Sequence, residues 1–262
     1  MKPAAALAAC LLLSGCATAS VPVGTPTPVG GYLETGALDA VVAGVRAPPP
    51  APSFWPGDLQ PAVEGKDRWW LATAQAELRP PEAGQHFDCI LGTRLAGRPR
   101  PALTRLMTRL LADSEAVTRR LGELHPRPRP VAVHPGLETC QRADAATRES
   151  PSWPAAGAVA GAVFGEMFAA LAPDQAEALK ERGRDIGRSR SICRMNWSTD
   201  VEDGHRVGRR VYVSATEAPD FLVDLDAARA EIVAARAEGL TNPGCAAERR
   251  ALAPGAVRLD EG

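Results

Sequence analysis

The sequence has few lysines, few aromatic residues and almost no net charge. Among 262 residues, 30 are Lys or Arg and 31 are Asp or Glu, which gives a formal net charge of −1. Such a balance provides no electrostatic footprint for nucleic acid, so we expect no nucleic-acid partner. Lys2, Lys66 and Lys180 are the only lysines, so nearly every basic group is an arginine.

Long hydrophobic runs are also missing, because no segment reaches the ~18 apolar residues of a membrane-spanning helix. A shorter apolar run, residues 4–13, follows Lys2 and leads into Leu13-Ser14-Gly15-Cys16. This order is typical of a lipoprotein signal peptide, residues 1–15, whose removal leaves Cys16 lipidated. We expect a lipid anchor rather than a membrane span, and Ala17 favours the periplasmic face of the outer membrane. A signal cleaved elsewhere, which would leave the protein in the periplasm, is the alternative.

Metal-binding patterns are absent too: there is no C-x-x-C and no clustered histidine, so we expect no metal and no other cofactor. Apart from Cys10 in the signal and Cys16, the chain holds Cys89, Cys140, Cys193 and Cys245. An even number of cysteines in an oxidising compartment predicts two disulfides. Four cysteines allow three pairings, of which we favour Cys89–Cys140 with Cys193–Cys245.

The body of the chain shows helical periodicity and no alternating apolar segments, which predicts an all-α, single-domain helical bundle. We expect a Pro/Gly-rich, mostly unpacked tether over residues 16–62, the bundle over 63–245, and a loose tail over 246–262. An apolar helix over 154–171, with small residues along it, should lie at the centre. The other expected helices cover residues 67–78, 102–124, 173–187, 196–214 and 224–238.

Three segments together carry a resemblance to a known family. They are Arg129-Pro130, then Pro154-Ala155-Ala156-Gly157, then Ser189-Arg190 followed by Asn196 and Asp200. Their order and spacing resemble the K-x6-R-P, P-S-G-H and S-R-x5-H-x3-D segments of the class A bacterial non-specific acid phosphatases. That family belongs to the superfamily of type 2 phosphatidic acid phosphatases and vanadium haloperoxidases, and the resemblance implies its helical fold.

The resemblance also shows which family residues are replaced. The family's attacking histidine falls at Asn196, whose amide nitrogen is not basic and cannot form a phosphoenzyme. Its leaving-group histidine falls at Gly157, its serine and glycine fall at Ala155 and Ala156, and its lysine falls at Gly122. Arg129, Arg190 and Asp200 are retained, although Asp200 has no imidazole to orient.

A few other basic side chains lie close enough in sequence to substitute for the missing groups. Arg119 or Arg120 could replace the lysine if the helix end shifts, and His125 and His134 lie near Arg129 in sequence. His205, five residues beyond Asp200, should point elsewhere on a helix at ~100° per residue. No Ser-centred or Gly-rich catalytic motif provides an independent active site.

We therefore expect a degenerate acid phosphatase: an inactive envelope lipoprotein in which Arg129 and Arg190 bind phosphate or a phosphorylated envelope component. One alternative is an active phosphomonoesterase with relocated catalytic groups. Another is a purely structural domain without anion binding. If the cavity is otherwise intact, histidine at Gly157 and Asn196 with lysine at Gly122 should recover weak activity.

Overall fold

A computed structural model describes residues 30–50, 64–134 and 136–253 of the chain. These residues form helices and no strand, which confirms the all-α prediction. The signal peptide, Cys16, most of the expected tether and the last nine residues lie outside the described part. No helix within it is both long enough and apolar enough to cross a membrane.

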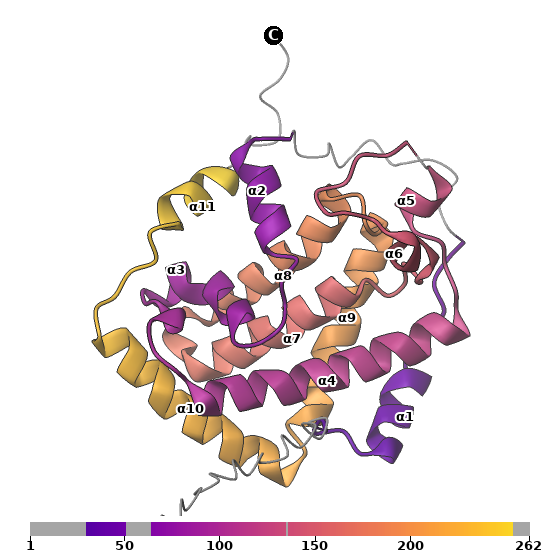
Figure 1. Cartoon of the computed structure of the whole chain (residues 1–262). Coiled ribbons are helices and arrows are strands. Elements are labelled where there is room, and N and C mark those ends of the chain that lie inside the picture. The colour runs from indigo at the N-terminus through magenta and orange to yellow at the C-terminus, as the bar shows by residue number, and fades with distance from the viewer. Residues whose placement is uncertain (1–29, 51–63, 135, 254–262) are drawn as a thin grey trace, which may run out of the picture.

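The bundle is arranged around α7 (Ala156–Leu171), which contacts α4 (Pro101–Leu124), α8 (Ala176–Ile192) and α9 (Ser198–Ala215) (Figure 1). The helix α10 (Pro219–Ala237) packs on α4. The shorter elements are α1 (Thr35–Ala43), α2 (Asp67–Ala74), η1 (Glu82–Phe87), α3 (Asp88–Leu91), η2 (Leu95–Gly97), α5 (Pro130–Val133), α6 (Ala145–Glu149), η3 (Pro173–Gln175) and α11 (Cys245–Ala251).

Small residues allow α8 and α9 to approach the backbone of α7. A Cβ atom on Gly161 would lie 2.6 Å from the carbonyl oxygen of Gly183 on α8. A Cβ atom on Gly208 of α9 would lie 2.4 Å from the carbonyl oxygen of Val159. Helices this close leave no room for side chains between them, so the prediction of a central helix packed on all sides is confirmed.

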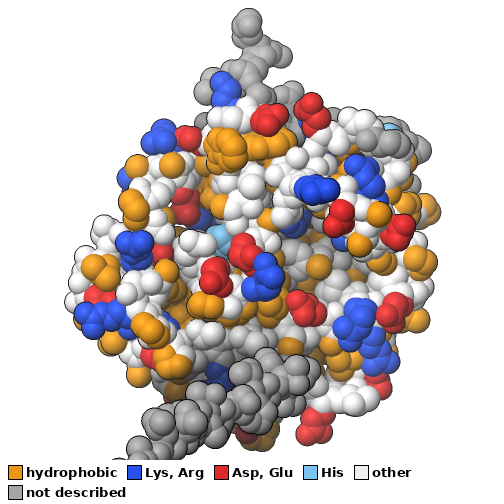
Figure 2. Space-filling model, viewed as in Figure 1, with side chains coloured by type: hydrophobic (Ala, Val, Ile, Leu, Met, Phe, Trp, Pro, Cys, Tyr) orange, Lys and Arg blue, Asp and Glu red, His pale blue; other side chains and the backbone are white. Residues whose placement is uncertain are grey.

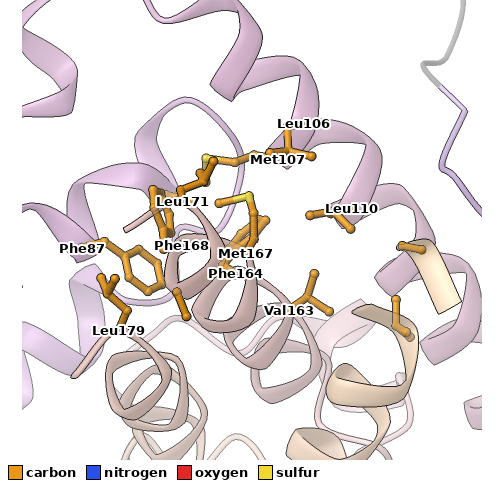
Figure 3. Close-up of a cluster of buried hydrophobic side chains, with 14 of the residues drawn as sticks. Phe87, Leu106, Met107, Leu110, Val163, Phe164, Met167, Phe168, Leu171 and Leu179 are labelled. Atoms are coloured by element: carbon orange, nitrogen blue, oxygen red, sulfur yellow. The ribbon is translucent and has the colours of Figure 1, made fainter. Parts of the chain in front are cut away.

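The main core lies between α7 and α4. Phe164, Met167 and Phe168 of α7 pack toward Leu106 and Met107 of α4, and all five side chains are buried (Figure 3). The apolar stripe predicted on residues 102–124 therefore faces the core, as its three- and four-residue spacing requires. On the face shown in Figure 2, acidic and basic side chains are interspersed, in keeping with the small net charge.

Several helix boundaries differ from the prediction for local reasons. The helix α2 ends at Ala74 rather than residue 78, and the chain then turns toward Pro80-Pro81, which cannot continue a helix. The helix α10 begins five residues earlier than expected because Pro219 occupies its first turn, where no backbone N–H is needed. The helix α8 extends one turn further, to Ile192, and so includes Arg190.

The prediction of an unpacked tether is wrong for residues 31–43, which pack on the bundle. Tyr32 is buried, and its hydroxyl donates a hydrogen bond to Asp224 on α10 (2.7 Å). The carboxylate of Asp113 on α4 accepts hydrogen bonds from the backbone N–H groups of Tyr32 (2.8 Å) and Leu33 (3.0 Å). Arg109 covers the Tyr32 ring at 3.9 Å from its centroid. This segment is part of the fold because its polar groups are satisfied only by the bundle.

The favoured disulfide pairing is also wrong: the bonds are Cys89–Cys245 and Cys140–Cys193. The prediction of a loose tail is wrong for its first residues, because they belong to α11 (Cys245–Ala251), which packs on α2. An ion pair between Arg182 and Glu248 (2.6 Å) holds α11 on α8 and places Cys245 beside Cys89. The two prediction errors thus have one cause, since the pairing depends on where the C-terminal helix docks.

We expect Asp113→Ala to lower the free energy of unfolding by roughly 2–4 kcal/mol, because two inward-facing N–H groups lose their acceptor. Urea denaturation followed by circular dichroism measures the change. The exposed Glu123 on the same helix provides a control, since Glu123→Ala should shift stability by less than about 0.5 kcal/mol. Equal stability of the two variants would show that the N-terminal segment is not held by Asp113.

Candidate phosphate site

A cavity of about 560 Å³ opens between α4, α7, the end of α8 and the segments around residues 73–79 and 141–150. It brings together five of the family positions, which come from three separate stretches of sequence: Arg129, Ala156, Gly157, Arg190 and Asn196. Other polar side chains line it as well: Thr73, Glu77, Arg79, Ser114, Glu115, Thr118, Gln141, Thr147 and Ser150. The structure thus places the retained arginines in one hollow.

Arg190 is the most unusual of these residues. Its side chain is only 7% exposed, and its Nη1 donates a hydrogen bond to Gln141 Oε1 (2.8 Å). Its Nε and Nη2 are buried and have no hydrogen-bond partner in the described part of the chain. These two nitrogens form one edge of the guanidinium, which is the edge that binds carboxylate or phosphate with two parallel hydrogen bonds.

Arg129 lines the same cavity and is held by the backbone of the α8–α9 turn and by Ser150. Its Nη1 donates to the carbonyl oxygen of Met195 (2.9 Å), and its Nε donates to Ser150 Oγ (3.0 Å). Burial, with help from Arg129 and Arg68, lowers the pKa of Arg190 to about 10. Burial likewise lowers the pKa of Arg129, whereas the carboxylate of Asp200 opposes the change. The positive charges of Arg129 and Arg68 disfavour the charged form of Arg190, so an anion beside Arg190 would be favourable.

Gly157 explains how Arg190 is buried. A Cβ atom at position 157 would lie 2.5 Å from Arg190 Cδ and 2.9 Å from Arg190 Cγ. The aliphatic stem of Arg190 therefore occupies the space directly over the α7 backbone where a histidine side chain would begin. Restoring histidine at this position requires Arg190 to move, so the expectation that simple restoration recovers activity does not fit the geometry.

Asp200 is retained but serves a different partner. It is fully buried, accepts a hydrogen bond from Ser152 Oγ (2.6 Å) and forms an ion pair with Arg127 (2.8 Å). Asn196 Nδ2 donates to the carbonyl oxygen of Ser152 (2.7 Å), so Ser152 stands between the amide and the carboxylate. Burial raises the pKa of Asp200, although the Ser152 hydrogen bond and the Arg127 charge oppose the rise. Asp200 therefore contacts a hydroxyl group and a guanidinium group, and no imidazole.

The remaining family positions lie outside the hollow or contribute no polar atom. Gly122 does not line it, and a Cβ atom there would lie 3.2 Å from Pro151. Arg120 forms an ion pair with Asp39 on α1, and Arg119 does not reach the cavity, so neither replaces the lysine. Ala155 is fully buried and Ala156 lines the cavity with a methyl group.

Histidines give no substitute either. His125 packs edge-on against Trp153 and His134 against Trp197, and no imidazole in the described residues lines the cavity. His205 lies against Gly187 of α8 and does not line the cavity, as its helical angle predicted. No group of three His, Cys, Asp or Glu side chains that could hold a metal ion occurs within residues 30–50, 64–134 and 136–253.

Two features of the site had no clear signal in the sequence. Gln141 follows a cysteine in an irregular segment and belongs to none of the three family segments. Arg127 lies between two prolines and far from Asp200 in the sequence. Only the folded structure brings the two together and identifies Arg127 as the counter-charge. A buried carboxylate requires a cation nearby, which was the one hint available for Arg127.

The chain is similar in sequence to several bacterial acid phosphatases. The chain is 25% identical to the non-specific acid phosphatase of Salmonella typhimurium over 173 residues, which cover 65% of this chain and 69% of the relative. It is 28% identical to the acid phosphatase of Zymomonas mobilis over 180 residues, 68% of each chain. It is 24% identical to the non-specific acid phosphatase of Providencia stuartii over 171 residues, 64% of this chain and 68% of the relative. No family model matches the chain.

We expect Arg127→Leu to destabilise the protein by about 3–5 kcal/mol at pH 7, because Asp200 then remains buried without its counter-charge. The loss should shrink toward pH 4. The pKa of Asp200 is already raised in the folded protein and rises further without Arg127, so the folded state is favoured when Asp200 is protonated and disfavoured above its unfolded pKa of about 4.

Chemical denaturation at several pH values measures this dependence. Arg119→Leu, at an exposed position of α4, serves as the control and should leave stability nearly unchanged throughout. A loss of stability in Arg127→Leu that is constant with pH would argue against the ion pair as its cause.

Proposed function

Because this chain is related to the bacterial acid phosphatases, we propose that its acid-phosphatase-like domain binds a phosphate-bearing anion and does not hydrolyse it. One observation carries the proposal: Arg190 is only 7% exposed, yet the Nε–Nη2 edge of its guanidinium has no hydrogen-bond partner in the described part of the chain. Leaving buried charged donors unpaired costs several kcal/mol, so a bound anion would relieve a strain that the protein alone does not.

The geometry supports a phosphate group better than a single-point anion. The two free nitrogens of Arg190 offer parallel donors, and the Nη2 of Arg129 forms no hydrogen bond with any described residue. A tetrahedral oxyanion can accept from both guanidinium groups at once. The cavity volume of about 560 Å³ exceeds what one phosphate fills, which leaves room for the remainder of a phosphate ester.

The family's mode of hydrolysis needs two imidazoles, and the described residues that line the cavity supply none. Asn196 has no basic lone pair with which to attack phosphorus, and its Nδ2 is engaged with Ser152. Gly157 cannot protonate a leaving group, which in other enzymes is worth roughly 10²–10⁴ in rate. Loss of a covalent nucleophile costs about 10⁶ in well-studied triad enzymes. Arginine clamps alone bind an ester without cleaving it.

The location belongs to the same proposal. The apolar run before Leu13-Ser14-Gly15-Cys16 supports an exported lipoprotein anchored through Cys16, at the periplasmic face of the outer membrane. The two disulfides agree with an oxidising compartment. Metabolic labelling with a radioactive fatty acid, compared between the natural chain and Cys16→Ala, tests the anchor directly.

We expect isothermal titration calorimetry to detect inorganic phosphate binding to the natural protein, and Arg190→Lys to weaken it at least about tenfold. Lysine keeps the charge but loses the two parallel donors, which are worth roughly 1.5–3 kcal/mol each to a charged partner. The same proteins are assayed with a chromogenic phosphate monoester near pH 6. Turnover that disappears in Arg190→Lys would overturn the inactive assignment in favour of an active phosphomonoesterase. Absence of both heat and thermal stabilisation would favour a purely structural domain.

We expect Gly157→Ala to weaken phosphate binding by about tenfold, because its Cβ atom displaces the stem of Arg190. The helix itself should not suffer, since alanine is the better helix former. Gly36→Ala on α1, whose Cβ atom meets nothing within 4 Å, is the matched control. Unchanged affinity in Gly157→Ala would show that the close contact with Arg190 is not needed for binding.

A further inference from the structure

The Cys140–Cys193 disulfide lies at the junction of the two segments that build the anion site. Cys140 directly precedes Gln141, which accepts the hydrogen bond from Arg190 Nη1. Cys193 is the C-cap residue of α8, three residues after Arg190 and three before Asn196. The disulfide therefore joins the residue next to Gln141 to the turn that follows Arg190.

The turn after Cys193 is tightly organised around Arg190. The carbonyl oxygen of Arg190 accepts hydrogen bonds from the N–H groups of Met195 (3.0 Å) and Asn196 (3.3 Å), and Arg194 adopts a φ of 60° to close the turn. A positive φ at a residue other than glycine costs energy and persists only where the surroundings enforce it. Cys193 is fully buried in a small apolar cluster with Trp69 and Met195, against which Cys140 packs.

The segment that contains Gln141 has few other attachments. Arg194 Nη1 donates to the carbonyl oxygen of Glu138 at an exposed position (3.0 Å), and Thr73 Oγ1 donates to that of Cys140 at a long distance (3.4 Å). Exposed or long hydrogen bonds contribute little to holding a segment in place. The disulfide is consequently the strongest link between this segment and α8.

We infer that the Cys140–Cys193 disulfide and Gln141 act together as a positioning device for Arg190: the disulfide fixes Gln141 on Nη1, and Gln141 holds the guanidinium with its Nε–Nη2 edge available to the anion. The inference rests on the proposed function, because it concerns the same cavity. Gln141 is a positioning residue in this scheme, and the disulfide acts only through it.

The test compares phosphate affinity, by calorimetry at a temperature where circular dichroism shows every variant folded. Cys140→Ser with Cys193→Ser should weaken binding about tenfold, and Gln141→Ala should do the same with both disulfides intact. The combined triple variant should bind no more weakly than either, because contacts in one chain of interactions are not additive. Cys89→Ser with Cys245→Ser removes the other disulfide and should leave the affinity within about twofold of the natural protein.

The outcomes separate the two proposals. If the natural protein binds no phosphate, the proposed function fails. If it binds and Gln141→Ala or the Cys140/Cys193 variant binds equally well, only the positioning device fails. A roughly hundredfold loss in the triple variant would show that the disulfide acts independently of Gln141 and would also overturn the inference. Should the Cys140/Cys193 variant fail to fold, Gln141→Ala alone decides, since it disturbs no covalent link.

Discussion

Burial of the Arg190 guanidinium against the backbone of α7 is the constraint on which the site depends. The contact is possible only because position 157 lacks a side chain, and it places a cation where burial already lowers its pKa to about 10. Arg129, Gln141 and the turn at Met195 are all arranged around that one cation. A charge in this position requires either a fixed counter-ion from the protein or a mobile one from solution.

The protein does supply a fixed counter-ion nearby, but to a different arginine. Asp200 forms an ion pair with Arg127 and accepts a hydrogen bond from Ser152, so Arg127 balances most of its negative charge. In the related acid phosphatases the corresponding carboxylate is expected to orient a histidine, and here it braces the start of α7 and α9 instead. The position of Asp200 in the motif does not by itself reveal these contacts, because a fold or a motif does not determine what a side chain does.

The sequence was sufficient for those features that local patterns determine. Helical periodicity predicted α4 and α7 almost to their ends, and the family resemblance implied that Arg129, Arg190 and Asn196 share one site, where the structure places them. It failed where the outcome depends on docking between distant parts. The pairing of Cys89 with Cys245 follows from the position of α11, and the burial of Tyr32 follows from a carboxylate on α4; neither has a local signature. Gln141 could not be predicted for the same reason, because its hydrogen bond with Arg190 depends on the fold and has no signature in the sequence.

The contacts of Tyr32 also have a consequence for the order in which the fold is completed. Its backbone is bonded to a residue 81 positions later and its hydroxyl to one 192 positions later, and the Cys89–Cys245 bond spans 156 residues. Contacts this distant in sequence form late, since long loops must close first. The segment around Tyr32, near the start of the described chain, therefore completes its contacts only after α10 has been synthesised.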